Sequence, residues 1–275
     1  MNEQARIELE EAVRLLESPG FGIRIADLVG SPIEKAIALL PDKATNTIGA
    51  AAQKAILGAL RLSLKTMEHH DPGSGMPAPK ASNRGHLGAV AVSGAIGGAF
   101  GLMALSIELP VSTTIMMRSI ADIARSEGGD LGDIRTQLEC VQILAFGGNA
   151  SSDDAAEVGY FVAREAMTRA VAEAATWIAK HGLQKEAAPA VIRLIVQVAE
   201  RYSVNVTEKA AAQLVPIVGA VGGAMINTIF MDHFQNMARG HFVIRRLERT
   251  HGEAAVRKAY LAAREKLRTG LPPPR

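Results

Sequence analysis

Two long stretches without a charged residue most constrain what this chain can fold into. The first runs from Leu87 to Ile107, 21 residues, and the second from Ala210 to Met231, 22 residues. Both reach the roughly 20 apolar residues that a helix needs to cross a bilayer. Each stretch must therefore be buried, either in lipid or in the centre of a large helical protein.

Both stretches contain the same pattern of glycines. The sequence GAIGGA at 94–99 is echoed by GAVGGA at 219–224. In a helix, glycines four residues apart lie on one face and let a second backbone approach closely. Each glycine costs about 1 kcal/mol relative to alanine in a helix, so close packing has to offset that cost. We therefore expect a packing or binding role for these glycines, which are Gly94, Gly97, Gly98, Gly219, Gly222 and Gly223.

Three interpretations of the glycine-rich stretches stay open. The first, which we favour, is a buried pair of closely packed helices. The second is a hairpin that inserts into a membrane or rests on it. The third is a loop for a cofactor or a phosphate group. Against the third, neither stretch has the lysine and hydroxyl of a Walker motif or a convincing preceding strand.

Composition and periodicity elsewhere favour helices. Alanine is abundant, aromatic residues make up 4% of the chain, and alternating runs of β-branched residues are nearly absent. Apolar residues recur at steps of three and four in segments 3–17 and 191–202. Breakers such as 18–20 (SPG) and the glycine pair 147–148 end such segments. The sequence predicts an all-α fold, a single multi-helix domain with two glycine-rich apolar helices packed at its centre.

The clearest interruption of the helical pattern is HHDPGSGMPAPKASNRG at 69–85, where prolines and glycines follow one another closely. The helices before it are too few to form a stable domain alone. We therefore predict one domain over residues 1–270, with a flexible loop at 69–85 and a disordered tail at 271–275.

Charge and cysteine content narrow the classes of partner and compartment. A net charge of +2 is too small for a duplex-binding surface, and no aromatic residues alternate with basic ones, so no nucleic acid is expected. The single cysteine, Cys140, fits a reducing compartment. The acidic, amphipathic N-terminus does not resemble a secretion signal. We predict a cytoplasmic protein.

The C-terminal segment 241–270 is basic. It holds eight arginines and lysines against three glutamates, a local excess of five positive charges. Such a segment can lie on an anionic lipid surface. More often it is a solvated helix face, and both interpretations stay open.

Glu108, Asp232 and His233 are the candidates for catalysis. Glu108 follows the first uncharged stretch, where burial would raise the pKa of its carboxyl unless a cation such as Arg118 compensates. His233 follows Asp232 but shares a helical stripe with Phe230 and other apolar residues, which favours a packed histidine over a ligand. An ion pair would explain Glu108 about as well as a catalytic role.

Common catalytic and metal-binding signatures are missing from the chain. It has no Gly-x-Ser-x-Gly, His-Glu-x-x-His or paired Cys-x-x-Cys, and it lacks the paired Glu-x-x-His of helical carboxylate sites. We therefore predict no metal and no cofactor. Three polar residues after the second glycine pattern are candidates for binding or packing: Asn227, Asn236 and Arg239.

Four segments resemble the EcsC family of bacterial proteins, and together they extend from about Leu9 to Tyr260. They are LESPGFGIRIADLVGSPIE, CVQILAFGG, SDDAAEVGYFVARE and, most specific, KAAAQLVPIVGAVGGAMINTIFMDHFQNMARGHFVIRRLER. The family takes its name from a protein encoded beside the ATPase and membrane subunits of an ABC transporter. The resemblance implies a helical protein with a link to membrane transport or secretion, and it supplies no catalytic residues.

We expect a non-catalytic accessory protein that associates peripherally with the inner membrane or with a membrane protein complex, and oligomerisation is compatible with this role. One alternative is a hydrolase-type enzyme that uses Glu108, Asp232 and His233. A second alternative is a soluble lipid-binding protein, in which the glycine-rich helices would line an apolar cavity.

Overall fold

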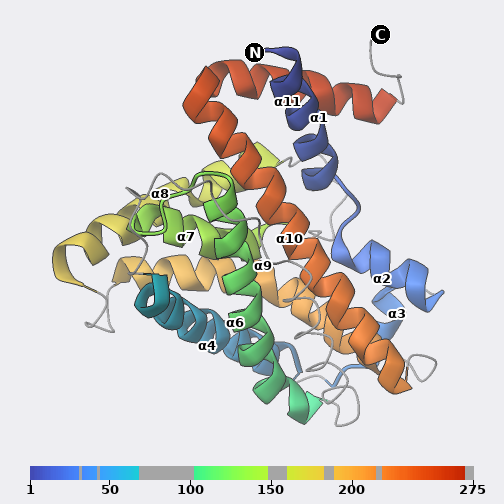
Figure 1. Ribbon diagram of the computed structural model, residues 1–275. Helices are drawn as coiled ribbons and strands as arrows, with labels where there is room; N and C mark the ends of the chain where they lie inside the picture. Colours follow the sequence, from blue (N-terminus) through green and yellow to red (C-terminus); the bar gives the residue numbers. More distant parts are fainter. Residues whose placement is uncertain are drawn as a thin grey trace.

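The computed structural model describes residues 1–30, 33–41, 44–67, 102–147, 160–182, 189–214 and 219–269 (Figure 1). Within these ranges the chain forms ten α-helices and a short 3-10 helix and contains no strand, which confirms the all-α prediction. The helices are α1 (Glu3–Leu16), α2 (Phe21–Val29), α3 (Ile33–Ile37), α4 (Ala44–Met67), α6 (Leu102–Ser126), α7 (Ile134–Gln142), α8 (Tyr160–His181), α9 (Pro189–Gln213), α10 (Gly219–His251) and α11 (Glu253–Thr269); the 3-10 helix is Ile143–Ala145.

Helix ends follow local sequence signals. The side chain of Asn2 accepts a hydrogen bond from the backbone N–H of Ala5 and caps α1, and Asp133 caps α7 in the same way. Gly30 and Gly128 take positive φ angles of 69° and 72° after α2 and α6, a conformation that glycine adopts without steric cost. The predicted loop at 69–85 and tail at 271–275 lie outside the described residues.

The longest helix, α10, runs through the middle of the molecule (Figure 1). It contacts α1 and α11 toward its C-terminal end, and α2, α6 and α9 in its N-terminal half. Helix α4 packs on α6 and α9, and α8 packs on α7 and α9. The central position of α10 explains why most of the polar contacts described below include one of its residues.

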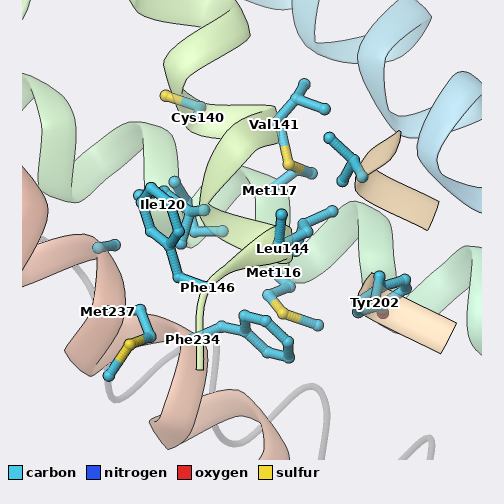
Figure 2. Packing of buried hydrophobic residues seen from close by; sticks show 14 of the residues in the cluster. Met116, Met117, Ile120, Cys140, Val141, Leu144, Phe146, Tyr202, Phe234 and Met237 are labelled. Carbon is cyan, nitrogen blue, oxygen red and sulfur yellow. The ribbon is translucent and has the colours of Figure 1, made fainter. Parts of the chain in front are cut away.

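A continuous cluster of buried apolar side chains joins these helices. Figure 2 shows the part where α6, α7, the 3-10 helix, α9 and α10 meet, with Met116, Phe146 and Phe234 among the buried side chains that it labels. Burying one such side chain stabilises the fold by about 1.5–3 kcal/mol. The predicted stripe at 191–202 is part of this cluster and is buried: Val191, Leu194, Ile195, Val198, Ala199 and Tyr202.

One face of the second glycine-rich stretch packs inside the protein where the structure describes it, whereas Met225 in the same stretch is exposed. Gly222 and Gly223 are buried in the first turns of α10, followed by buried Ile226 and Phe230. This agrees with the buried-helix interpretation of that stretch. Within the described ranges, no helix combines the length and the apolar character that crossing a membrane requires.

The pairing of the two glycine-rich stretches stays a prediction. Gly94, Gly97 and Gly98 lie outside the described residues, and Gly219 is described only as the first residue of α10.

Candidate functional site

Glu108 forms a buried ion pair with Lys209. The ammonium of Lys209 on α9 donates hydrogen bonds of 3.0 and 2.9 Å to the two carboxylate oxygens of Glu108 on α6. The side chain of Lys209 is 0% exposed and that of Glu108 is 6% exposed. Asn227 on α10 donates a third hydrogen bond of 3.0 Å to the same carboxylate. The cluster therefore joins three helices.

The suggestion that Arg118 could be the cation beside Glu108 was wrong. Arg118 is exposed and lies ten residues further along α6, whereas Lys209 continues the buried stripe of α9 beyond Tyr202. Burial lowers the pKa of Lys209, and the charge and hydrogen bonds of Glu108 act in the opposite direction. Lys209 lies on a helical stripe of mainly apolar residues. That position in the sequence could have predicted a buried lysine with an acidic partner.

Asp232 belongs to a different contact, between α2 and α10. Arg24 donates a hydrogen bond of 2.8 Å to its carboxylate, and Asn236 donates another of 3.2 Å. Arg239 in turn donates to the side-chain oxygen of Asn236 at 3.0 Å. The side chain of Asp232 is 35% exposed, so this is a partly hydrated contact that fixes α2 to α10.

His233 is packed in the apolar core. Its ring lies against Phe21 and Phe234, with centroid distances of 6.3 and 5.0 Å. Its edge also meets Gly147, where a Cβ atom would overlap the imidazole. Burial, with a smaller effect from the charge of Arg24, lowers the pKa of His233 to about 4, so the ring is neutral at pH 7.

The three predicted catalytic candidates thus take part in three separate sets of contacts. Glu108 interacts with α9, Asp232 with α2, and His233 with the backbone around Gly147. In the part of the chain that the structure describes, no three His, Cys, Asp or Glu side chains are grouped so that they could hold a metal ion. The arrangement ties helices together and does not present acid and base groups to one substrate position.

A second buried polar network was missed by the sequence reasoning. His241 on α10 shares a hydrogen bond of 2.8 Å with the hydroxyl of Tyr160 on α8. Arg245 donates to Glu139 on α7 and to Glu248, both at 3.0 Å. Burial opposes ionisation of Glu139, but His241, whose Nε2 lies 3.9 Å from the carboxylate, and the charge and hydrogen bonds of Arg245 outweigh it and lower the pKa of Glu139 to about 2.

Most of the basic side chains in the C-terminal segment are paired within the molecule. Arg246 forms ion pairs with Glu8 at 3.0 Å and with Glu127 at 2.8 Å, and Arg264 pairs with Glu17 at 3.0 Å. The positive excess of segment 241–270 is therefore offset by acidic residues from elsewhere in the fold. These pairs hold α1 against α10 and α11.

Comparison with known families identifies one matching family. The model of the EcsC protein family matches residues 3–247, which is most of the 275-residue chain. The chain belongs to the EcsC family. The match includes the Glu108–Lys209–Asn227 cluster and the α2–α10 contact of this EcsC protein, and it ends before α11. No curated protein and no solved structure matches the chain.

Proposed function

We propose that this EcsC protein is a non-catalytic accessory protein that associates peripherally with the cytoplasmic side of a membrane or with a membrane protein complex. The observation that carries this proposal is a group of large apolar side chains exposed on α2 and just after α3. Ile23 is 48% exposed, Leu28 39% and Leu39 63%. Apolar side chains exposed on neighbouring elements occur at sites that bind lipid or another protein.

These side chains come from elements that lie near one another in the fold. In Figure 1, α2, α3 and the first turns of α10 lie at the same end of the molecule. Met225 in these first turns of α10 is also exposed. We call this group, Ile23, Leu28, Leu39 and Met225, the apolar end.

The charges of the protein favour an apolar over an electrostatic attachment. Arg246 and Arg264, which could have bound anionic headgroups, are engaged with acidic residues of the same molecule. Screening by salt weakens contacts between exposed charges but leaves the burial of apolar surface intact. Attachment through the apolar end should therefore survive a salt wash.

Two further observations bear on the alternatives. A hydrolase would need Glu108, Asp232 and His233 at one substrate position, and their separate contacts favour a structural role for each. Family membership supports a link to ABC transport or secretion through the protein from which the family takes its name. We therefore place a membrane protein complex of that kind first among the partners.

The test is membrane fractionation of the natively expressed protein, with a high-salt wash followed by a detergent wash. We expect the protein to sediment with membranes, to resist salt and to be released by detergent. Leu39→Asp should move it to the soluble fraction. Val162→Asp is the matched control, because Val162 is similarly exposed, at 52%, and belongs to α8, a helix away from α2 and α3 in Figure 1. Recovery of the unmodified protein in the soluble fraction would refute the proposal.

A further inference from the structure

Glu208 on α9 is a buried acid with no cation beside it in the part of the chain that the structure describes. Its residue is 6% exposed, and its Oε2 atom is buried without a hydrogen-bond partner among the described residues. The neighbouring Lys209 is directed to Glu108 instead. A buried carboxylate without a compensating charge is costly, because the ion loses its hydration. This combination distinguishes Glu208 from Glu108 and Glu139, which each have a basic partner.

The partner of the Glu208 carboxyl is the first turn of α2. The backbone N–H of Gly22 donates a hydrogen bond to it. Gly20, the N-cap residue of α2, offers no side-chain cap, and the first N–H groups of a helix have no partner within the helix. Gly22 also lets the carboxyl approach, because a Cβ atom at this position would overlap it. Glu208 thus caps α2 from a different helix.

The charged groups around Glu208 belong to the helices packed on this part of α9. Arg24 is paired with Asp232 of α10, and buried His233 of α10 is neutral at pH 7. The remaining charged residues of α2 and α3 are exposed: Asp27, Glu34 and Lys35. Burial raises the pKa of Glu208 first, the charge of Glu34 raises it further, and the bond from Gly22 lowers it, so that it lies at about 7.

We propose that Glu208 is a proton-controlled latch that holds α2 and α3 against α9. The neutral carboxyl group of Glu208 lies against Gly22 and buries no charge. When it ionises, its proton passes to water, and the buried negative charge and the repulsion from Glu34 favour a state in which α2 and α3 have moved away and the carboxylate is hydrated.

The latch has a consequence for the surface of the protein. Phe21 and Ile25 on α2 are both 0% exposed in the closed state. Opening would bring them to the surface beside the exposed Ile23 and Leu28. The latch is an intramolecular equilibrium and goes beyond the proposed membrane association. It is tested in the absence of lipid, so failure of one proposal leaves the other intact.

The size of the effect follows from the two pKa values of Glu208. The pKa is about 7 in the closed state and returns toward its ordinary value of 4.5 when the carboxyl is hydrated. An acid with a raised pKa stabilises the closed state below the lower value, and this stability is lost as the pH rises through the higher one. The opening constant should rise up to tenfold per pH unit in this window, roughly 300-fold in total.

The test is hydrogen–deuterium exchange of the full chain between pH 5 and 8, with each rate corrected for the pH dependence of intrinsic exchange. We expect protection of the α2 and α3 amides to fall as the pH rises to about 7 and then to level off, while α8 amides keep their protection. Glu208→Gln, which preserves shape and hydrogen bonding without a charge, should abolish this response. Glu200→Gln, which neutralises an exposed acid on the same helix, should retain it.

Two results would overturn the latch. One is protection of α2 and α3 that does not change with pH in the unmodified protein. The other is a Glu208→Gln variant with the original response. If Glu208→Gln does not fold, Glu34→Gln replaces it, because Glu34 is exposed and its substitution should leave the fold intact. Removing the Glu34 charge should reduce the fold-change in opening, and an unchanged fold-change would contradict the proposal.

Discussion

Substituting Lys209 by methionine should destabilise the protein strongly. The substitution keeps a long flexible side chain but leaves the carboxylate of Glu108, 6% exposed, without its cation. At the observed separation of 2.9 Å, the attraction lost is about 6 kcal/mol for an effective dielectric constant of 20. Part of it is offset because the ammonium no longer has to be dehydrated. Breaking a buried pair from one side costs about 3–5 kcal/mol, so we expect a loss of about 4 kcal/mol.

The double variant Glu108→Leu, Lys209→Met should recover most of that loss. Removing both charges leaves no buried ion, and an apolar replacement of a buried pair is often neutral or stabilising. The free energy of unfolding would be measured by urea denaturation at pH 7, followed by circular dichroism, with the midpoint and slope reported for each variant. The coupling energy between the two positions should be about 3 kcal/mol or more.

The matched control is Arg169→Gln. Arg169 and Glu173 form an ion pair with a similar distance of 2.8 Å on α8, but the arginine side chain is 90% exposed. Exposed pairs contribute little because water and salt screen them, so the urea midpoint should not move measurably. The reasoning is refuted if Lys209→Met shifts the midpoint as little as Arg169→Gln does. It is also refuted if the double variant loses the sum of the two single losses.

Two further predictions concern Gly147 and Glu139. Gly147→Ala should lower the free energy of unfolding of the protein more than Gly182→Ala does. The Gly182 substitution should cost about 1 kcal/mol, because it places a residue with a side chain at a positive φ. Both glycines have positive φ, 72° and 69°, but only at Gly147 would the new Cβ overlap His233; equal losses in urea unfolding would contradict this. Glu139→Gln should lower the free energy of unfolding by about 2 kcal/mol at pH 7, because it weakens the charged hydrogen bonds from Arg245. Because the pKa of Glu139 is lowered from 4.5 to about 2, that difference should vanish as the pH falls through this window, and a constant difference would contradict it.

The sequence predicted the helices well where their signals are local. Periodic apolar residues defined α1 and the stripe of α9, and α1 ends at Leu16, just before the breaker at 18–20. The same reasoning favoured a packed His233, and this residue is 1% exposed. Such predictions succeed because a helix buries one face, and the spacing of residues along the chain shows which face that is.

Partners distant in the sequence could not be predicted in this way. Glu108 and Lys209 are 101 residues apart, and the nearer cation, Arg118, is exposed. Arg246 and Glu8 are 238 residues apart, so a local charge count on segment 241–270 could not show that its excess is offset. That Glu208 has no cation beside it among the described residues also depends on which helices surround it.

The sequence alone therefore determined the all-α class, the end of α1 and the buried faces of α1 and α9. The tertiary structure decided which buried faces meet, and through that which ionisable groups are paired, neutral or left without a cation. The physical reason is that helix formation and amphipathicity depend on neighbours within a few residues. Electrostatic pairing and burial depend instead on distances in space, which the packing of all the helices around α10 sets.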